Sequence, residues 1–297
     1  MRIAVCPSCG MQTLNDYGTY YECSHCGLKL VSGGATSASS GSTSGSSGST
    51  PSPSGVTAAA PITEPPTDES ALILYIGPAE AHLVGVKRYL DKVILPDKVD
   101  ADSIPLTTIE AEAFKSVAAC VNTIIVPDSV KTIERYAASN CKKLRYFRLP
   151  STITEISQGM FYGCEALREV EIPSSVKVID EDAFYCCRSL SSPFFIPEGV
   201  RIIGTDAFTG CDFTEITLPS TLRRLKSCFN SCSRLRRIRI LSTSIELEEN
   251  REYFQSCYSL EEIIIPKGAK INLKVWKKQR HFKAKIIAVK DPSTYDI

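Results

Sequence analysis

Residues 164–187 read CEALREVEIPSSVKVIDEDAFYCC, and this stretch decides the fold. Val170 and Ile172 alternate with charged residues, as in a short strand that buries one face, and Pro173 ends the strand because it has no N–H to donate. The second half of the stretch turns further apolar residues inward and closes on Cys187. One such unit cannot bury its apolar face alone, so it predicts a stack of similar units.

The same unit recurs along the chain. An apolar residue followed by proline marks most copies, and Leu241 replaces the proline in one of them. These prolines are Pro96, Pro127, Pro150, Pro173, Pro197, Pro219 and Pro266. From Pro127 onward the marker positions lie 23, 23, 24, 22, 22 and 25 residues apart. A constant period of this length predicts a solenoid in which successive strands form a parallel sheet about 4.8 Å apart.

The full pattern is C-x2-L-x2-V-x-I-P-x2-V-x2-I-x3-A-F-x2-C. It resembles the BspA-like, Treponema-type leucine-rich repeat family over roughly residues 85–270. The resemblance implies a leucine-rich-repeat solenoid of short parallel β-strands joined by short helical or 3-10 turns. It also implies binding of a protein or a surface ligand, and many members of the family are exported.

Six of the thirteen cysteines occupy one position of the repeat. They are Cys141, Cys164, Cys187, Cys211, Cys232 and Cys257. We interpret this position as a small buried slot in the core, because free cysteine behaves as a compact apolar residue. The alternative is a redox or metal array, with the adjacent Cys186 and Cys187 as its best members. Cys120 and Cys228 lie off the repeated position.

Residues 1–31 carry four more cysteines in two C-x2-C pairs thirteen residues apart. The spacing predicts a structural Zn²⁺ site with four thiolate ligands, Cys6, Cys9, Cys23 and Cys26, in a small module that resembles the zinc ribbon family. Residues 19–22 and 28–31 are predicted to form its hairpin. Iron in a rubredoxin-like site is the nearest rival, and two disulfides are the third reading.

The composition divides the chain into three segments. Residues 32–70 are rich in Ser, Gly and Pro and bury almost nothing apolar, which predicts a disordered linker between the ribbon at 1–31 and the repeat domain at 71–297. Within the repeat domain we expect residues 71–90 and 270–297 to cap the two open ends. The excess residues around 97–106 are expected to form a loop.

The candidate binding surface is the outward side of the repeated strands. The residues predicted to point outward are Lys92, Ile94, Thr123, Ile125, Tyr146, Arg148, Glu169, Glu171, Phe195, Glu215, Thr217, Arg237, Arg239, Glu262 and Ile264. One reading is a solvated sheet in which Arg148 pairs with Glu171, and Arg237 with Glu215 and Glu262. The other is a recognition face for a macromolecular partner, formed by Tyr146, Arg148, Glu169, Glu171, Phe195, Arg237 and Arg239, with the two aromatic residues as anchors.

The net charge of +1 conceals an uneven distribution. Residues 71–218 hold 15 basic and 20 acidic side chains, whereas residues 219–297 hold 17 basic and 8 acidic ones. Nucleic acid is therefore the alternative partner, bound by the ribbon and the basic C-terminal end, with Trp276 and Phe282 as stacking residues.

Several function classes find no support in the sequence. It contains no nucleotide-binding loop, HExxH motif or G-x-S-x-G elbow, and His82 has no acidic partner at motif spacing. We find neither a stretch of 18 apolar residues nor the apolar region of a secretory signal, and so expect no membrane contact and a cytoplasmic location. We expect a non-enzymatic interaction scaffold or adaptor with a protein partner. An exported, adhesin-type protein is a second alternative, which the apparent lack of a signal and the thiolate site put in doubt.

The zinc assignment is directly testable. Purified residues 1–31 are expected to bind about one equivalent of zinc under reducing conditions, because so short a chain needs a metal to fold. Metal analysis by mass spectrometry measures the ratio, with Cys9→Ser as the variant that should lose it. Less than about half an equivalent in the unaltered module would refute the site.

Overall fold

The computed structural model describes the backbone of residues 14–16, 20–23 and 29–31, and residues 65–87, 89–99, 103–280 and 282–294 in full. The chain divides into two units, Met1–Pro65 and Pro66–Ile297. In the first unit, strands β1 (Leu14–Asp16), β2 (Tyr20–Cys23) and β3 (Lys29–Val31) form an antiparallel sheet in the order β1-β2-β3. The predicted hairpin is thus confirmed as β2–β3, whereas β1 was not predicted.

The predicted zinc ligands cannot be assessed from this sheet. Cys6, Cys9 and Cys26 lie outside the described residues, and only the backbone of Cys23 is described, as the last residue of β2. The predicted linker also lies outside them up to residue 64. The four residues 67–70 do not belong to a linker, because Thr67 exchanges two hydrogen bonds with Ile94, donating from its N–H over 2.7 Å and accepting at its hydroxyl over 2.8 Å.

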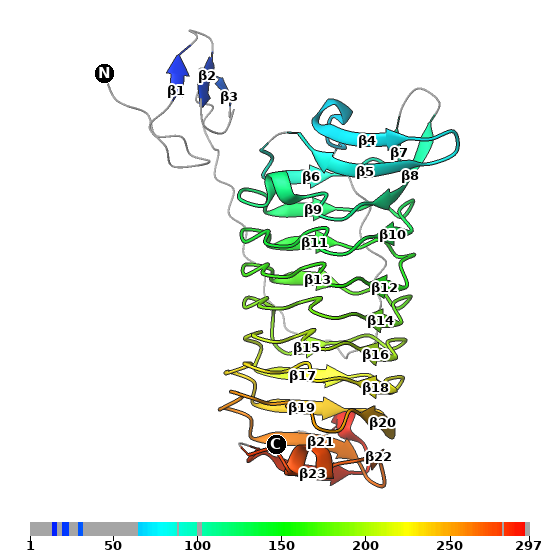
Figure 1. The fold of residues 1–297 in the computed structure, drawn as a ribbon, viewed down its shortest axis with the longest axis vertical. Helices are drawn as coiled ribbons and strands as arrows, with labels where there is room; N and C mark the ends of the chain where they lie inside the picture. The colour runs from blue at the N-terminus through cyan, green and yellow to red at the C-terminus, as the bar shows by residue number, and fades with distance from the viewer. Residues whose placement is uncertain are drawn as a thin grey trace, which may run out of the picture. The chain divides into compact units, whose positions relative to one another are not determined.

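In the second unit the predicted strands stack in parallel as a first row (Figure 1). This row consists of β6 (Lys92–Ile94), β9 (Thr123–Ile125), β11 (Tyr146–Arg148), β13 (Glu169–Glu171), β15 (Phe194–Phe195), β17 (Glu215–Leu218), β19 (Arg237–Ile240), β21 (Glu262–Pro266) and β23 (Lys285–Val289). The leucine-rich-repeat solenoid predicted from the pattern is confirmed.

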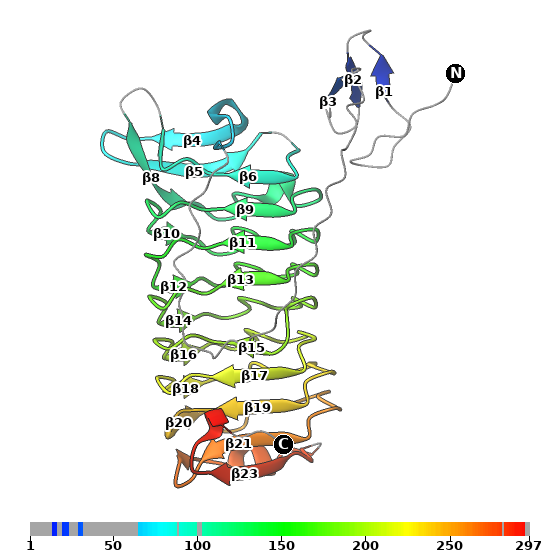
Figure 2. The ribbon, with the colours of Figure 1, turned by 180° about the vertical axis from the view of Figure 1, so that it is seen from behind.

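A second row of short parallel strands lies on the other side of the core (Figure 2). It consists of β10 (Thr132–Ile133), β12 (Glu155–Ile156), β14 (Val178–Ile179), β16 (Ile202–Ile203), β18 (Arg224–Leu225), β20 (Ser244–Leu247) and β22 (Lys270–Ile271). The sequence predicted that Val176 and Ile179 turn inward, and both are buried, but it did not predict strands there. Two-residue strands are too short to show an alternating pattern.

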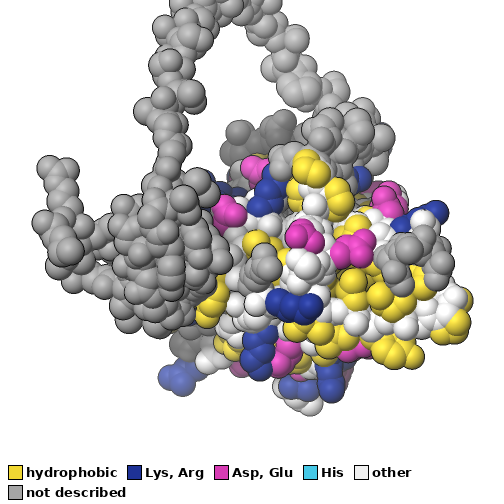
Figure 3. Space-filling model, turned by 90° about the horizontal axis from the view of Figure 1, so that it is seen from above, with side chains coloured by type: hydrophobic (Ala, Val, Ile, Leu, Met, Phe, Trp, Pro, Cys, Tyr) yellow, Lys and Arg dark blue, Asp and Glu magenta, His cyan; other side chains and the backbone are white. Residues whose placement is uncertain are grey.

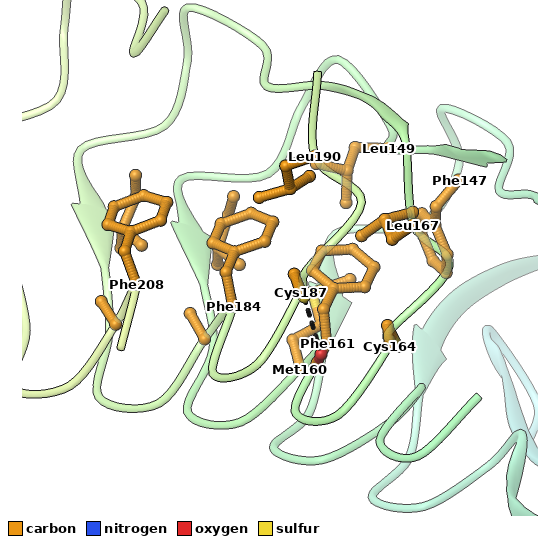
Figure 4. Packing of buried hydrophobic residues seen from close by; sticks show 14 of the residues in the cluster. Phe147, Leu149, Met160, Phe161, Cys164, Leu167, Phe184, Cys187, Leu190 and Phe208 are labelled. Carbon is orange, nitrogen blue, oxygen red and sulfur yellow. Dashed lines mark hydrogen bonds between the residues drawn. The ribbon is translucent and has the colours of Figure 1, made fainter. Parts of the chain in front are cut away.

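The core between the rows is a column of aromatic rings and thiols (Figure 4). Phe184 stacks on Phe161 and on Phe208 of the neighbouring coils, with ring centroids 5.2 and 5.3 Å apart. The thiol of Cys187 donates to the carbonyl oxygen of Phe161 over 3.2 Å, and four other cysteines of the slot donate to the preceding coil in the same way. The predicted burial of the slot is therefore confirmed, with Cys257 only partly buried, but the slot is hydrogen-bonded rather than purely apolar.

The cysteines outside the slot also have structural places. Cys228 fills the buried position that Ala183 and Ala207 occupy in other coils. Cys186 has a φ of 58° and lies in the left-handed turn before the slot, a position that Gly163 and Gly210 occupy elsewhere. The described cysteines are all free thiols, and the described residues contain no cluster that could hold a metal.

Both ends of the solenoid are closed by added elements. At the N-terminal end, the first coil is preceded by η1 (Glu69–Ala71), β4 (Leu72–Ile76) and β5 (Ala81–Val86). Residues 97–106, predicted to form a loop, instead contain β7 (Lys98–Val99) and the start of β8 (Ile104–Ile109), which pair antiparallel. The sheet order is β10-β8-β5-β4, and η2 (Lys115–Val117) follows β8. At the C-terminal end come α1 (Lys274–Lys277), β23 and η3 (Pro292–Thr294). None of the helices formed by described residues is long and apolar enough to cross a bilayer.

The buried thiols predict how stability depends on pH. Burial, with a smaller effect of Cys120, raises the pKa of Cys141 to about 12. The folded chain therefore keeps this thiol protonated while the unfolded chain ionises it above about pH 8.5, so the stability falls as the pH rises through this range. Cys141→Ala should cost about 1 kcal/mol at pH 7. Between pH 7 and pH 10 the unaltered chain alone should lose about 2 kcal/mol, because only it carries the thiol, so the variant should become the more stable chain by about 1 kcal/mol at pH 10.

Urea unfolding under reducing conditions at the two pH values measures this deficit. Ile133→Val is the matched control, since it removes a buried methyl group that does not titrate, and its deficit should be the same at both pH values. A deficit for Cys141→Ala that does not change with pH would contradict the assignment of a buried, protonated thiol.

Candidate partner-binding face

The outward side of β11, β13 and β15 forms the candidate face. Tyr146 and Arg148 flank the fully buried Phe147, and both are half-buried on the opposite side of the strand. The parallel register places Tyr146 beside Glu169 and Arg148 beside Glu171. Four of the predicted binding residues therefore lie together on one side of two adjacent strands, with the two glutamates exposed.

Phe195 lies where the first row is interrupted. The coil from Pro173 to Pro197 is one residue longer than its predecessor, and it contains Pro193, which has no N–H to donate to β13. The row therefore splits into a sheet ending at β13 and a sheet starting at β15, which pairs with β17 alone. Phe194 faces the core, and the ring of Phe195 is 60% exposed at the interruption.

The charges on this part of the face are not paired with each other. The solvated-sheet reading pairs Arg148 with Glu171, but the described residues show no ion pair between them although they are neighbours in register. Burial, followed by the negative charge of Glu171, raises the pKa of Tyr146 above its usual value. At neutral pH this phenol is therefore a protonated hydrogen-bond donor, beside a cation and two anions.

The C-terminal part of the same row is neutralised internally. Arg237 donates to Glu215 over 3.0 Å and to Glu262 over 3.2 Å, as the solvated-sheet reading predicted. Arg239 also donates to Glu215, over 3.1 Å. Both guanidinium groups are thus held in intramolecular ion pairs, and the candidate face no longer includes them.

Two residues predicted to point outward are buried. Ile94 is 6% exposed because residue Thr67 pairs with its backbone from the N-terminal side. Ile264 is fully buried, and η3 lies against β19 and β21 near it. Each end of the row is therefore covered by an added segment, and the open part lies between them.

The structure also corrects the nucleic-acid reading. Trp276 is fully buried against Phe254, with ring centroids 5.6 Å apart, and Phe282 packs against the same core. The ring of Trp276 is therefore not available to stack on a base, and the ring of Phe282 is partly covered. In the basic segment, Arg224 pairs with Glu246 over 3.0 Å and Arg236 with Glu261 over 3.0 Å, which reduces the free positive charge.

His82 is the one histidine that the structure describes, and its neighbours are carboxylates. His82 on β5 lies 3.6 Å from Glu80 and 3.5 Å from Glu110, so it does have acidic neighbours that motif spacing did not reveal. Glu110 follows the parallel strand β8, and only the sheet pairing brings it close. His281 lies outside the described residues.

Stacked parallel strands with a repeated apolar, proline-ended pattern define a leucine-rich-repeat solenoid. The sequence matches a model of the BspA type leucine rich repeat region, in six copies, over residues 107–227 and 190–283. These matches span more than half of the chain, which therefore belongs to the BspA-type leucine-rich repeat family.

One solved structure agrees with this fold, and a second resembles the chain in sequence only. A leucine-rich repeat protein of T. pallidum is 23% identical and covers 76% of this chain and 100% of its own, with a TM-score of 0.57. A leucine-rich repeat protein from Bacteroides ovatus is 16% identical over 74% of this chain and 88% of its own, with a TM-score of 0.37. No curated protein matches the chain.

The internal ion pairs yield a stability prediction. Glu215→Ala should cost about 1–3 kcal/mol, because two guanidinium groups that are 22% and 15% exposed lose the carboxylate they share. The matched control is Glu261→Ala, which breaks a pair with Arg236 whose side chains are both more than half exposed. It should cost much less than Glu215→Ala, because solvent screens an exposed pair. Thermal and urea unfolding compare the two, and equal costs would contradict the difference in burial.

Proposed function

We propose that this protein is a non-enzymatic scaffold that binds a protein partner through the face formed by Tyr146, Arg148, Glu169, Glu171 and Phe195. An extended sheet is the surface that repeat solenoids usually offer to partners. Membership of the leucine-rich repeat family supports an interaction role in general and leaves the identity of the partner open.

One observation carries the choice of this face. Within the described first row, the side chains from β11 to β15 combine an exposed aromatic ring with charges that have no mutual ion pair, whereas β17 to β21 are neutralised and partly covered. Aromatic and arginine side chains contribute most to binding when a partner excludes water from them. Phe195 is the expected anchor, and Tyr146 and Arg148 supply directional hydrogen bonds beside it.

The N-terminal module adds a second part to the proposal. We infer that Cys6, Cys9, Cys23 and Cys26 hold a structural Zn²⁺ and that the module is joined to the solenoid by a flexible linker. The confirmed β2–β3 hairpin, which ends its first strand at Cys23, supports a ribbon-like module. Four thiolates would complete the coordination of zinc, so the metal would stabilise the fold and leave no open position for catalysis.

Location stays a prediction from the sequence. A cytoplasmic protein is consistent with nine described cysteines that are all reduced, since thiols persist in a reducing compartment. The exported, adhesin-type alternative predicts instead that the protein is found at the cell surface. Fractionation of the source cells, followed by detection with an antibody against the solenoid, distinguishes the two.

The binding face is tested by substitution. Affinity capture with the full chain, and in parallel with residues 66–297, identifies the partner and shows whether the N-terminal module contributes. Phe195→Ala should then weaken the solenoid–partner complex at least about tenfold, because the exposed ring loses its buried contact with the partner. Tyr146→Ala should weaken it as well, and calorimetry measures both.

Tyr258→Ala is the matched control, because it removes an aromatic side chain that is 83% exposed and lies outside the proposed face. Its affinity should equal that of the unaltered chain. Unchanged affinity for the Phe195 and Tyr146 variants would exclude this face, and capture of nucleic acid alone, lost at physiological salt, would favour the electrostatic alternative.

A further inference from the structure

The N-terminal end of the solenoid presents an unpaired strand. Strand β4 is the last in the order β10-β8-β5-β4, and it pairs with β5 alone. In the described part of the chain, no backbone hydrogen bond reaches the outer edge of β4. An edge of free N–H and C=O groups is a template on which a further strand can form.

This edge is also apolar. Ile73, Tyr75 and Ile76 are 42%, 59% and 43% exposed, and Val84 on the neighbouring β5 is 40% exposed. The described residues include seven large apolar side chains that are exposed, and five of them lie at this end of the solenoid: these four and Tyr89. Figure 3 looks onto this end and shows apolar side chains gathered along one side of it.

The opposite end of the solenoid is protected differently. Strand β23 is the last of the first row, and the exposed lysines Lys283, Lys285 and Lys290 lie on it or next to it. Charged side chains, above all lysine, keep edges from pairing because they cannot be desolvated cheaply. Strand β4 contains no charged residue and no proline, and the irregularity in its pairing comes from the extra residue Val84 in β5, so β4 itself runs regularly.

We propose that β4 of a second copy of this chain pairs antiparallel with this edge and forms a two-fold symmetric dimer. A register centred on Leu74 sets Ile73 of one copy opposite Tyr75 of the other, and Leu72 opposite Ile76. Pairs of aromatic and β-branched residues across neighbouring strands are among the stabilising ones. The stretch from 72 to 76 is uncharged, so bringing two copies together meets no repulsion between these strands.

The two-fold arrangement follows from the position of the edge. An isologous contact buries both apolar edges at once and closes the assembly, whereas pairing of β4 with the lysine-rich end would leave an edge open and grow a filament. A five-residue strand buries little area, so we expect a weak dimer with a dissociation constant in the micromolar range.

Sedimentation velocity of the full chain over a range of concentrations tests the proposal. The unaltered chain should show a reversible monomer–dimer equilibrium. The double variant Ile73→Lys, Tyr75→Lys should raise the dissociation constant at least tenfold, because each lysine would be placed opposite a lysine of the other copy. Tyr258→Lys, which alters an exposed ring far along the sequence, should leave the equilibrium unchanged.

A photo-crosslinking phenylalanine analogue at Tyr75 reports the geometry. Cross-links between residues 72–76 of two copies are expected, and the melting temperature of the lysine variant should match that of the unaltered chain, which shows that it still folds. The proposal is overturned if the unaltered chain stays monomeric at about 100 μM, well above the expected dissociation constant. It is also overturned if residue 75 cross-links to the 270–290 segment, or if the lysine variant still forms the dimer.

Discussion

The structure depends on one repeated contact between neighbouring coils: the thiols of five of the six slot cysteines donate to a backbone carbonyl oxygen of the preceding coil. Cys187 does so to Phe161 and Cys211 to Phe184, each over 3.2 Å, while the phenylalanine rings of those coils stack along the same column. The same carbonyl oxygen also accepts an N–H of its own coil, as Phe161 does from Cys164 over 3.1 Å, so the thiol adds a bond between coils to one within the coil. Cysteine is small enough for the buried slot and supplies this donor, so packing accounts for its recurrence, and the described residues contain no cluster that could hold a metal.

This column keeps the coils in register, and the register determines the surface. Because the strands stack in parallel with no shift, a residue on one coil lies directly beside its counterpart on the next, so opposite charges at the same repeat position meet. That is why Arg237 lies between Glu215 and Glu262. The same register places Tyr146 and Arg148 beside the two glutamates of β13, the strand at which the first sheet of the row ends. The interruption of the row after β13 therefore separates the neutralised part of the row from the proposed binding face.

The two ends of the solenoid show that closing a stack of coils is a separate problem from building it. At the C-terminal end Trp276 and Phe282 cover the last rings of the column, and the exposed edge carries lysines. At the N-terminal end a hairpin covers the core just as completely, since Leu72, Leu83 and Val86 are buried, but the outer strand stays apolar. Coverage of the core and protection of an edge are thus provided by different residues, and only one end has both.

The sequence by itself determined the repeat, the parallel first row and the burial of the slot cysteines, because each rests on a local pattern that recurs with a fixed period. It also identified the residues that face outward on each strand, with the exceptions of Ile94 and Ile264. Only the tertiary structure showed the second row, the pairing of β7 with β8, and the proximity of Glu110 to His82. It also showed that Trp276 belongs to the core and that Arg239 shares Glu215 with Arg237. The second row recurs with the same period, but its strands are mostly too short to show an alternating pattern. The other features depend on which side chains and distant segments lie side by side, and a periodic pattern in the sequence does not carry that information.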